Sequence, residues 1–99
     1  MPVMSFTRWK SREQELMREE ASAAKQHMMK AGAQSVEMHR FHSGAFIGEW
    51  LVVARYANWE AYGKAQDALT GDAKYQALLK RVMEKAELVG RSVLVDQAI

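Results

Sequence analysis

The 99-residue sequence has no cysteine and only one proline, Pro2. The absence of thiols excludes disulfide bonds, thiolate metal sites and a cysteine nucleophile, and it fits a cytoplasmic protein. Long apolar runs are also missing, because no segment approaches the roughly 18 apolar residues that a membrane span requires. The first residues lack the charged start and apolar centre of a signal peptide. The sequence therefore predicts no membrane association.

The sequence also lacks a large excess of basic or acidic residues. The 14 basic and 12 acidic residues are interspersed and leave a net charge of +2, so no basic stripe indicates nucleic-acid binding. No glycine-rich phosphate loop or nucleophile-elbow motif is present, and the spacing of the three histidines fits no metal motif. We therefore predict no metal and no cofactor. The hydrophobic share of 48% indicates one folded domain that spans residues 1–99.

Apolar periodicity divides the chain into strands and helices. Ser11 and Gln14 form a capping-box pattern, Gly32 suits a helix C-terminus, and Asn58 and Asp72 can cap two further helical segments. The pattern predicts strands over 3–9, 35–42, 45–56 and 89–95, and helices over 12–31 and 58–86, with an interruption at 70–72. The order β-α-β-β-α-β is ferredoxin-like: an antiparallel four-stranded sheet with two helices on one face of an α+β fold.

The strand over 45–56 is the most informative segment, because it is apolar on both sides. Phe46, Trp50 and Val52 share one side, and Leu51 and Val53 share the other. A strand of this kind is normally covered on both faces. Two helices can cover only one, so we predict a homodimer that pairs through its sheet faces.

The predicted hairpin brings a candidate site together. A two-residue turn would place His39 opposite Gly48 and Glu37 opposite Trp50, and residues opposite each other share a face. His39 would then act as proton acceptor and Glu37 would orient it. Trp50 and Phe41 would wall an aromatic ligand above Gly48. The alternative is that Glu37 and His39 are solvated on an edge strand.

The other side of the same strands carries a second candidate set, Arg40, Glu49 and Arg55. These charges would line the space between two sheets and bind a ligand or form ion pairs with the partner subunit. Which side faces the helices stays open, although the uncharged Trp50 side favours that position. A further set of aromatic residues suits either a stacking pocket or the core: Trp9, Trp59, Tyr62 and Tyr75.

Two segments, 48–62 and 71–78, resemble the strand-into-helix passage and the helix restart of NIPSNAP-like and antibiotic-biosynthesis-monooxygenase-like members of the dimeric α/β-barrel superfamily. The resemblance implies a dimeric barrel and a cofactor-independent monooxygenase or isomerase-like enzyme, or else a non-catalytic ligand-binding or stress-responsive dimer. Many of these relatives carry a histidine on the second helix, and this chain has none between 58 and 87. The resemblance therefore does not imply haem binding. We expect a dimer that binds a small apolar or aromatic molecule; a purely structural module with a filled barrel is the third alternative.

Overall fold

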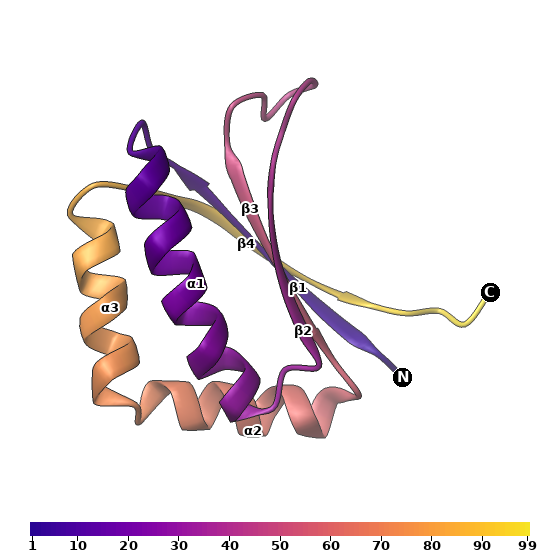
Figure 1. Cartoon of the computed structure of the whole chain (residues 1–99). Helices are drawn as coiled ribbons and strands as arrows, with labels where there is room; N and C mark the ends of the chain where they lie inside the picture. The colour runs from indigo at the N-terminus through magenta and orange to yellow at the C-terminus, as the bar shows by residue number, and fades with distance from the viewer.

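Four antiparallel strands form one sheet (Figure 1), and their order across the sheet is β2-β3-β1-β4. The computed structural model describes all residues 1–99. Its elements are β1 (Val3–Lys10), α1 (Gln14–Ala31), β2 (Ser35–Arg40), β3 (Trp50–Tyr56), α2 (Trp59–Thr70), α3 (Ala73–Met83) and β4 (Glu87–Val95). The ferredoxin-like α+β fold predicted from the sequence is confirmed.

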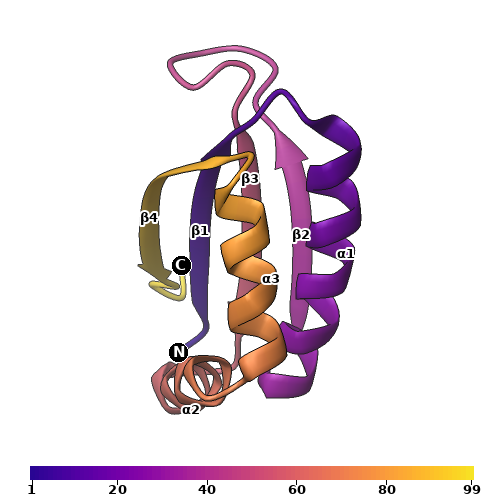
Figure 2. The same ribbon diagram turned by 90° about the vertical axis from the view of Figure 1, so that its left-hand side faces the viewer.

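The helices leave one face of the sheet bare. α1 and α3 lie over one face, and α2 runs across the end of the sheet below them (Figures 1 and 2). The predicted interruption at residues 70–72 separates α2 from α3. We call the face beneath α1 and α3 the helix face and the opposite one the open face. No helix is long and apolar enough to cross a membrane.

The core lies between the sheet and the helices. Trp50 of β3 packs with Trp9 of β1 and with side chains of α1 and α3, and it is only 5% exposed. A second buried cluster surrounds Ala54 and Tyr56 of β3 and includes residues of α1 and α2. The side of β3 that carries Trp50 therefore meets the helices, as predicted from the absence of charged residues on that side.

Side-chain caps define two of the three helix starts. Asn58 accepts the Ala61 N–H at 2.8 Å at the start of α2, and Asp72 accepts the Tyr75 N–H at 3.0 Å at the start of α3. The capping box predicted at Ser11 is wrong. α1 begins later, at Gln14. The Ser11 hydroxyl accepts the Glu13 N–H at 3.1 Å, before the helix, and donates to the Lys85 carbonyl at 2.9 Å. That bond ties the turn before α1 to the turn before β4.

The β2–β3 connection also differs from the prediction, and the difference changes which side chains share a face. β2 ends at Arg40 and β3 begins at Trp50, so residues 41–49 form a loop instead of a two-residue turn. Gly44 and Gly48 adopt positive φ angles of 93° and 85° there, which favours glycine. Arg40 pairs with Trp50, whereas the predicted hairpin paired Glu37 with Trp50. The register moves by an odd number of residues, so Glu37 lies on the opposite face from Trp50.

Candidate functional site

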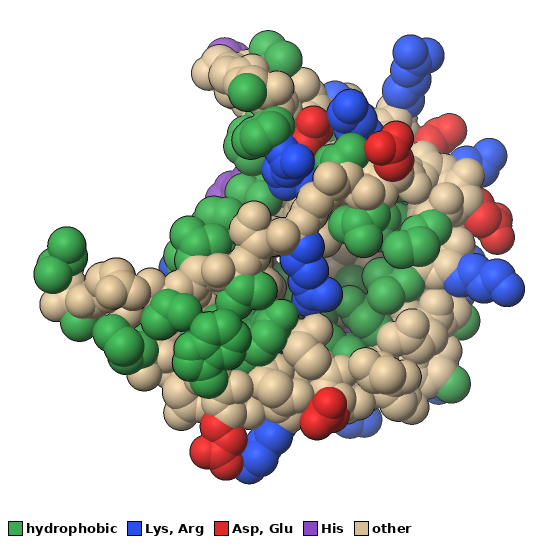
Figure 3. All heavy atoms as spheres, turned by 180° about the vertical axis from the view of Figure 1, so that it is seen from behind, with side chains coloured by type: hydrophobic (Ala, Val, Ile, Leu, Met, Phe, Trp, Pro, Cys, Tyr) green, Lys and Arg blue, Asp and Glu red, His purple; other side chains and the backbone are tan.

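A largely apolar pocket lies on the helix face, between the sheet and the helices α1 and α3. Its volume is about 130 Å³, and twelve of its fifteen lining residues are hydrophobic. α1 contributes Ala21 and Ala24, whose small side chains leave space beside Val52 of β3. Figure 3 shows hydrophobic side chains gathered around a hollow on the far side of the molecule, with a basic side chain among them. The pocket is suited to a small apolar or aromatic molecule.

The three remaining lining residues are polar and come from different elements: Thr7 of β1, Glu20 of α1 and Arg91 of β4. Glu20 pairs with Arg81 at 3.3 Å. Arg91 forms no ion pair and donates to the Gln66 side-chain oxygen at 3.1 Å. The pocket therefore combines apolar walls with one guanidinium that has no carboxylate partner.

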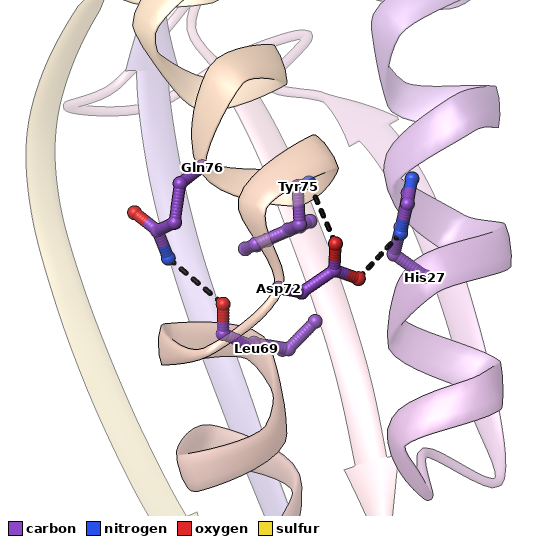
Figure 4. Close-up of polar contacts among 5 residues, drawn as sticks. All are labelled: His27, Leu69, Asp72, Tyr75 and Gln76. Carbon is purple, nitrogen blue, oxygen red and sulfur yellow. Dashed lines mark hydrogen bonds and ion pairs between the residues drawn. The ribbon is translucent and has the colours of Figure 1, made fainter.

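Tyr75 brings a hydroxyl to the same pocket. Burial raises the pKa of Tyr75, and the positive charge of Arg91 opposes that rise. The phenol is therefore protonated at neutral pH and can donate a hydrogen bond to a ligand. The start of α3 holds this residue in place, because the Asp72 carboxylate accepts its N–H and is itself bonded to His27 of α1 (Figure 4).

The predicted Glu37–His39 pair is formed, but it lies on the open face, on the other side of the sheet from the pocket. His39 Nε2 donates to Glu37 Oε2 at 3.0 Å, and Arg55 approaches the same oxygen at 4.0 Å. These contacts lower the pKa of Glu37, the hydrogen bond from His39 most of all. All three side chains are 45–58% exposed.

The prediction that Trp50 forms an aromatic wall beside that pair is wrong. Trp50 is buried beneath the helices and donates its ring N–H to the Ser11 carbonyl at 3.3 Å. Gly48 does not lie opposite His39, which pairs with Leu51. The physical reason is the longer β2–β3 loop, which shifts the register and places the sheet between Trp50 and His39.

The second predicted set is also divided between the two faces. Arg40 pairs with Trp50 and its guanidinium lies 4.8 Å from the Trp50 ring, whereas Arg55 lies on the open face. Glu49 is 8% exposed and pairs with Arg8 of β1 at 3.7 Å. Phe41 contacts Phe46, and both line a second, open hollow on the open face beside Arg8.

Sequence reasoning left the role of one pocket residue, Tyr75, open and did not identify another, Arg91. Tyr75 fits both a core stripe and a pocket, and only the packing distinguishes the two. Arg91 was not singled out, although a signal exists. The register places Arg91 on the same side of β4 as Val93 and Val95, so it is the charged residue of an otherwise apolar strand side.

Comparison with known proteins supports the fold. No protein-family model matches the chain, and no curated protein matches it in sequence. Among solved structures, Rv0793 from Mycobacterium tuberculosis is 22% identical over 100% of both chains, with a TM-score of 0.70. SnoaB from Streptomyces nogalater, a cofactor-independent oxygenase, is 7% identical over 99% of this chain and 95% of its own, with a TM-score of 0.76. A NIPSNAP family protein from Agrobacterium tumefaciens is 17% identical over the same shares, with a TM-score of 0.72.

These similarities show the fold, a ferredoxin-like domain that the chain shares with a NIPSNAP family protein and with the oxygenase SnoaB. The resemblance noted in the sequence is thereby confirmed for the fold. Identities below a quarter say nothing of substrate or reaction, because one fold hosts many activities. The function has to be argued from the pocket.

Proposed function

We propose that the protein binds one small aromatic or apolar molecule per subunit in the helix-face pocket. The pocket itself is the observation that supports this proposal. Its volume of about 130 Å³ is close to that of an apolar protein cavity known to hold benzene, about 150 Å³. Arg91 and Tyr75 supply a cation and a hydroxyl at one part of its wall. A ring that carries an acidic or carbonyl group therefore fits better than a plain hydrocarbon.

The reaction that we favour is a cofactor-independent, monooxygenase-like oxidation. SnoaB, which shares the fold, is a cofactor-independent oxygenase. Without a cofactor the substrate must supply all the electrons itself. In balanced form, an activated CH₂ group and O₂ give a C=O group and water. The carboxylate of Glu20, which lines the pocket, would accept a proton from the substrate to start such a reaction, Arg91 would stabilise the resulting anion, and the proton would leave in the water that forms.

A non-catalytic ligand-binding or stress-responsive dimer is the alternative, because the pocket explains binding equally well without chemistry. A bound probe that is recovered unchanged under oxygen would favour this alternative. In either case the bare open face supports a homodimer that pairs through its sheets. We also propose that the protein is located in the cytoplasm.

A role for the Glu37–His39 pair remains a separate proposal. The pair lies across the sheet from the pocket, so it cannot reach a ligand held there by the same subunit. In a dimer closed over the open faces, His39 would face the enclosed space and could accept a proton from a ligand bound between the subunits. The experiment must therefore tell the two sites apart.

Methionine methyl groups report on both sites in one NMR experiment. Met17, Met28 and Met83 line the pocket, whereas Met4 lies on the open face, where its sulfur contacts Arg55 at 3.0 Å. Toluene and benzoate serve as a neutral and an anionic probe. We expect both probes to shift the signals of the three pocket methionines and to leave that of Met4 unchanged. A shift confined to Met4 would move the site to the Glu37–His39 pair.

A pocket-filling variant supplies the second arm of the experiment. Ala24→Phe places a ring in the pocket, and Gln26→Phe places the same ring at an exposed position of the same helix. We expect roughly tenfold or greater weakening of probe binding in the Ala24 variant and none in the Gln26 variant. Equal affinity in both variants would refute the proposed pocket.

A further inference from the structure

A histidine–carboxylate pair links the two helices that cover the pocket. Nδ1 of His27 on α1 donates to Oδ2 of Asp72, the residue before α3, at 2.7 Å (Figure 4). The other oxygen of the same carboxylate, Oδ1, accepts the Tyr75 N–H at 3.0 Å. One carboxylate therefore starts α3 with one oxygen and binds α1 with the other.

The link reaches the pocket through Tyr75. The Tyr75 side chain lines the pocket, and its ring centroid lies 5.8 Å from that of His27, with the rings tilted by 55°. On the other side, the Gln76 amide donates to the Leu69 carbonyl at 2.9 Å and ties α3 to the end of α2 (Figure 4). The first turn of α3, which includes Tyr75, is thus bonded to both neighbouring helices.

The second bond of Asp72 goes beyond what a helix cap requires. Asn58 caps α2 with the same type of contact, to the Ala61 N–H at 2.8 Å, and no side chain of another helix hydrogen-bonds to it. The bond from His27 adds nothing to the cap of α3, but it does fix α3 against α1 across 45 residues of sequence. These two helices form the pocket walls opposite the sheet.

We infer that His27 and Asp72 are positioning residues of the pocket, which place the Tyr75 ring for an aromatic ligand without touching that ligand. Neither His27 nor Asp72 is among the residues that line the pocket. The part of this inference that concerns ligand affinity rests on the proposed function. The part that concerns the position of Tyr75 does not, so the two can fail separately.

Fluorine NMR of the full chain tests the position of Tyr75 without any ligand. The chain has three tyrosines, so 3-fluorotyrosine labelling gives three signals, and Tyr75→Phe identifies the one of interest. His27→Leu removes the bond to Asp72. His27→Asn keeps a donor nitrogen at the same number of bonds from the backbone as Nδ1. His42→Leu is the control, because His42 lies in the exposed β2–β3 loop.

We expect His27→Leu to shift the Tyr75 signal and to leave the other two tyrosine signals in place, and we expect His27→Asn to restore it. His42→Leu should resemble the wild type. An unchanged Tyr75 signal in His27→Leu would overturn the inference, even if the probes bind. Shifts of all three signals that His27→Asn does not reverse would also overturn it, because they would indicate general loss of packing.

Binding of benzoate and toluene gives the second readout. We expect His27→Leu to weaken both probes about tenfold, since a lost hydrogen bond to a charged group is typically worth a factor of this order. His27→Asn should recover most of that loss. If neither probe binds the wild type, the proposed function fails, and the fluorine signal of Tyr75 alone decides whether His27 positions it.

Discussion

At the scale of single residues, the proposed preference of the pocket for anionic ligands depends on Arg91. It is the basic residue among the pocket-lining side chains, and it forms no ion pair within the chain. Arg91→Met should weaken benzoate binding roughly tenfold or more, because hydrogen bonds to charged groups contribute about 1.5–3 kcal/mol. Toluene, which has no charge, should bind as before. Titration of both probes by calorimetry or NMR measures the difference.

A matched control for this prediction is Arg12→Met. Arg12 is an exposed residue of the connection before α1 and does not line the pocket. It should leave both affinities unchanged. If Arg91→Met weakens toluene and benzoate equally, Arg91 acts through packing and does not select for an anionic group.

Glu37, His39 and Trp50 show which contacts between side chains can be predicted from a sequence. Glu37 and His39 are two apart on a strand, so they share a side in any register, and their predicted contact is present at 3.0 Å. Their predicted neighbour Trp50 depends on the register between two strands. That register is set by a loop whose length cannot be read from the strand pattern, because Gly44 alone suits a tight turn as well as a wider one.

At the scale of elements, the start of α3 predicts a dependence of stability on acidity. The Tyr75 N–H, and next the bond from His27, hold the pKa of Asp72 below its ordinary value. A depressed folded-state pKa stabilises the fold above the unfolded-state pKa. This contribution begins to decrease below about pH 4, the unfolded-state pKa of an aspartate, and it is lost completely only below the lower folded-state pKa.

The measurement is urea unfolding between about pH 6 and pH 3, combined with hydrogen exchange at the Tyr75 amide. Asp72→Asn keeps a cap acceptor but removes the titrating charge, so its stability should fall less on acidification than that of the wild type. Asp67→Asn on α2 is the control and should follow the wild type. Identical acid dependence of all three proteins would contradict the prediction.

Local chemistry explains why most elements could be predicted and some boundaries could not. Asn58 and Asp72 are recognisable because a short polar side chain precedes a helical apolar stripe, and both cap as expected. Ser11 has the same appearance, yet its hydroxyl accepts the N–H of Glu13, two residues later, and donates to the Lys85 carbonyl. The local bond of Ser11 thus closes a turn before the helix, and α1 begins at Gln14.

At the scale of the whole molecule, the sheet separates two kinds of surface. The helix face encloses a pocket that needs nothing from outside the chain. The open face carries apolar side chains such as Phe6, Leu51 and Leu94 with no helix above them (Figure 1). The two-sided apolar pattern of residues 45–56 predicted one face covered by helices and a second apolar face. The pocket itself could not be predicted, because it depends on how Ala21 and Ala24 meet the sheet in three dimensions.

The open face leads to the last prediction, which concerns assembly. Leu94 lies on this face and is 39% exposed, and Met29 on α1 is also 39% exposed but faces away from it. If two copies pair through their sheets, Leu94→Lys places a charge in the interface and should convert dimers to monomers, because an unpaired buried charge is costly. Met29→Lys adds the same charge elsewhere and should stay dimeric. Light scattering at micromolar concentration measures both masses, and circular dichroism checks that each variant is folded.

A wild-type protein that is a folded monomer at that concentration would show that the apolar open face is stable in water. In that case the enclosed space proposed for His39 would not exist, while the helix-face pocket, formed within one subunit, would be unaffected.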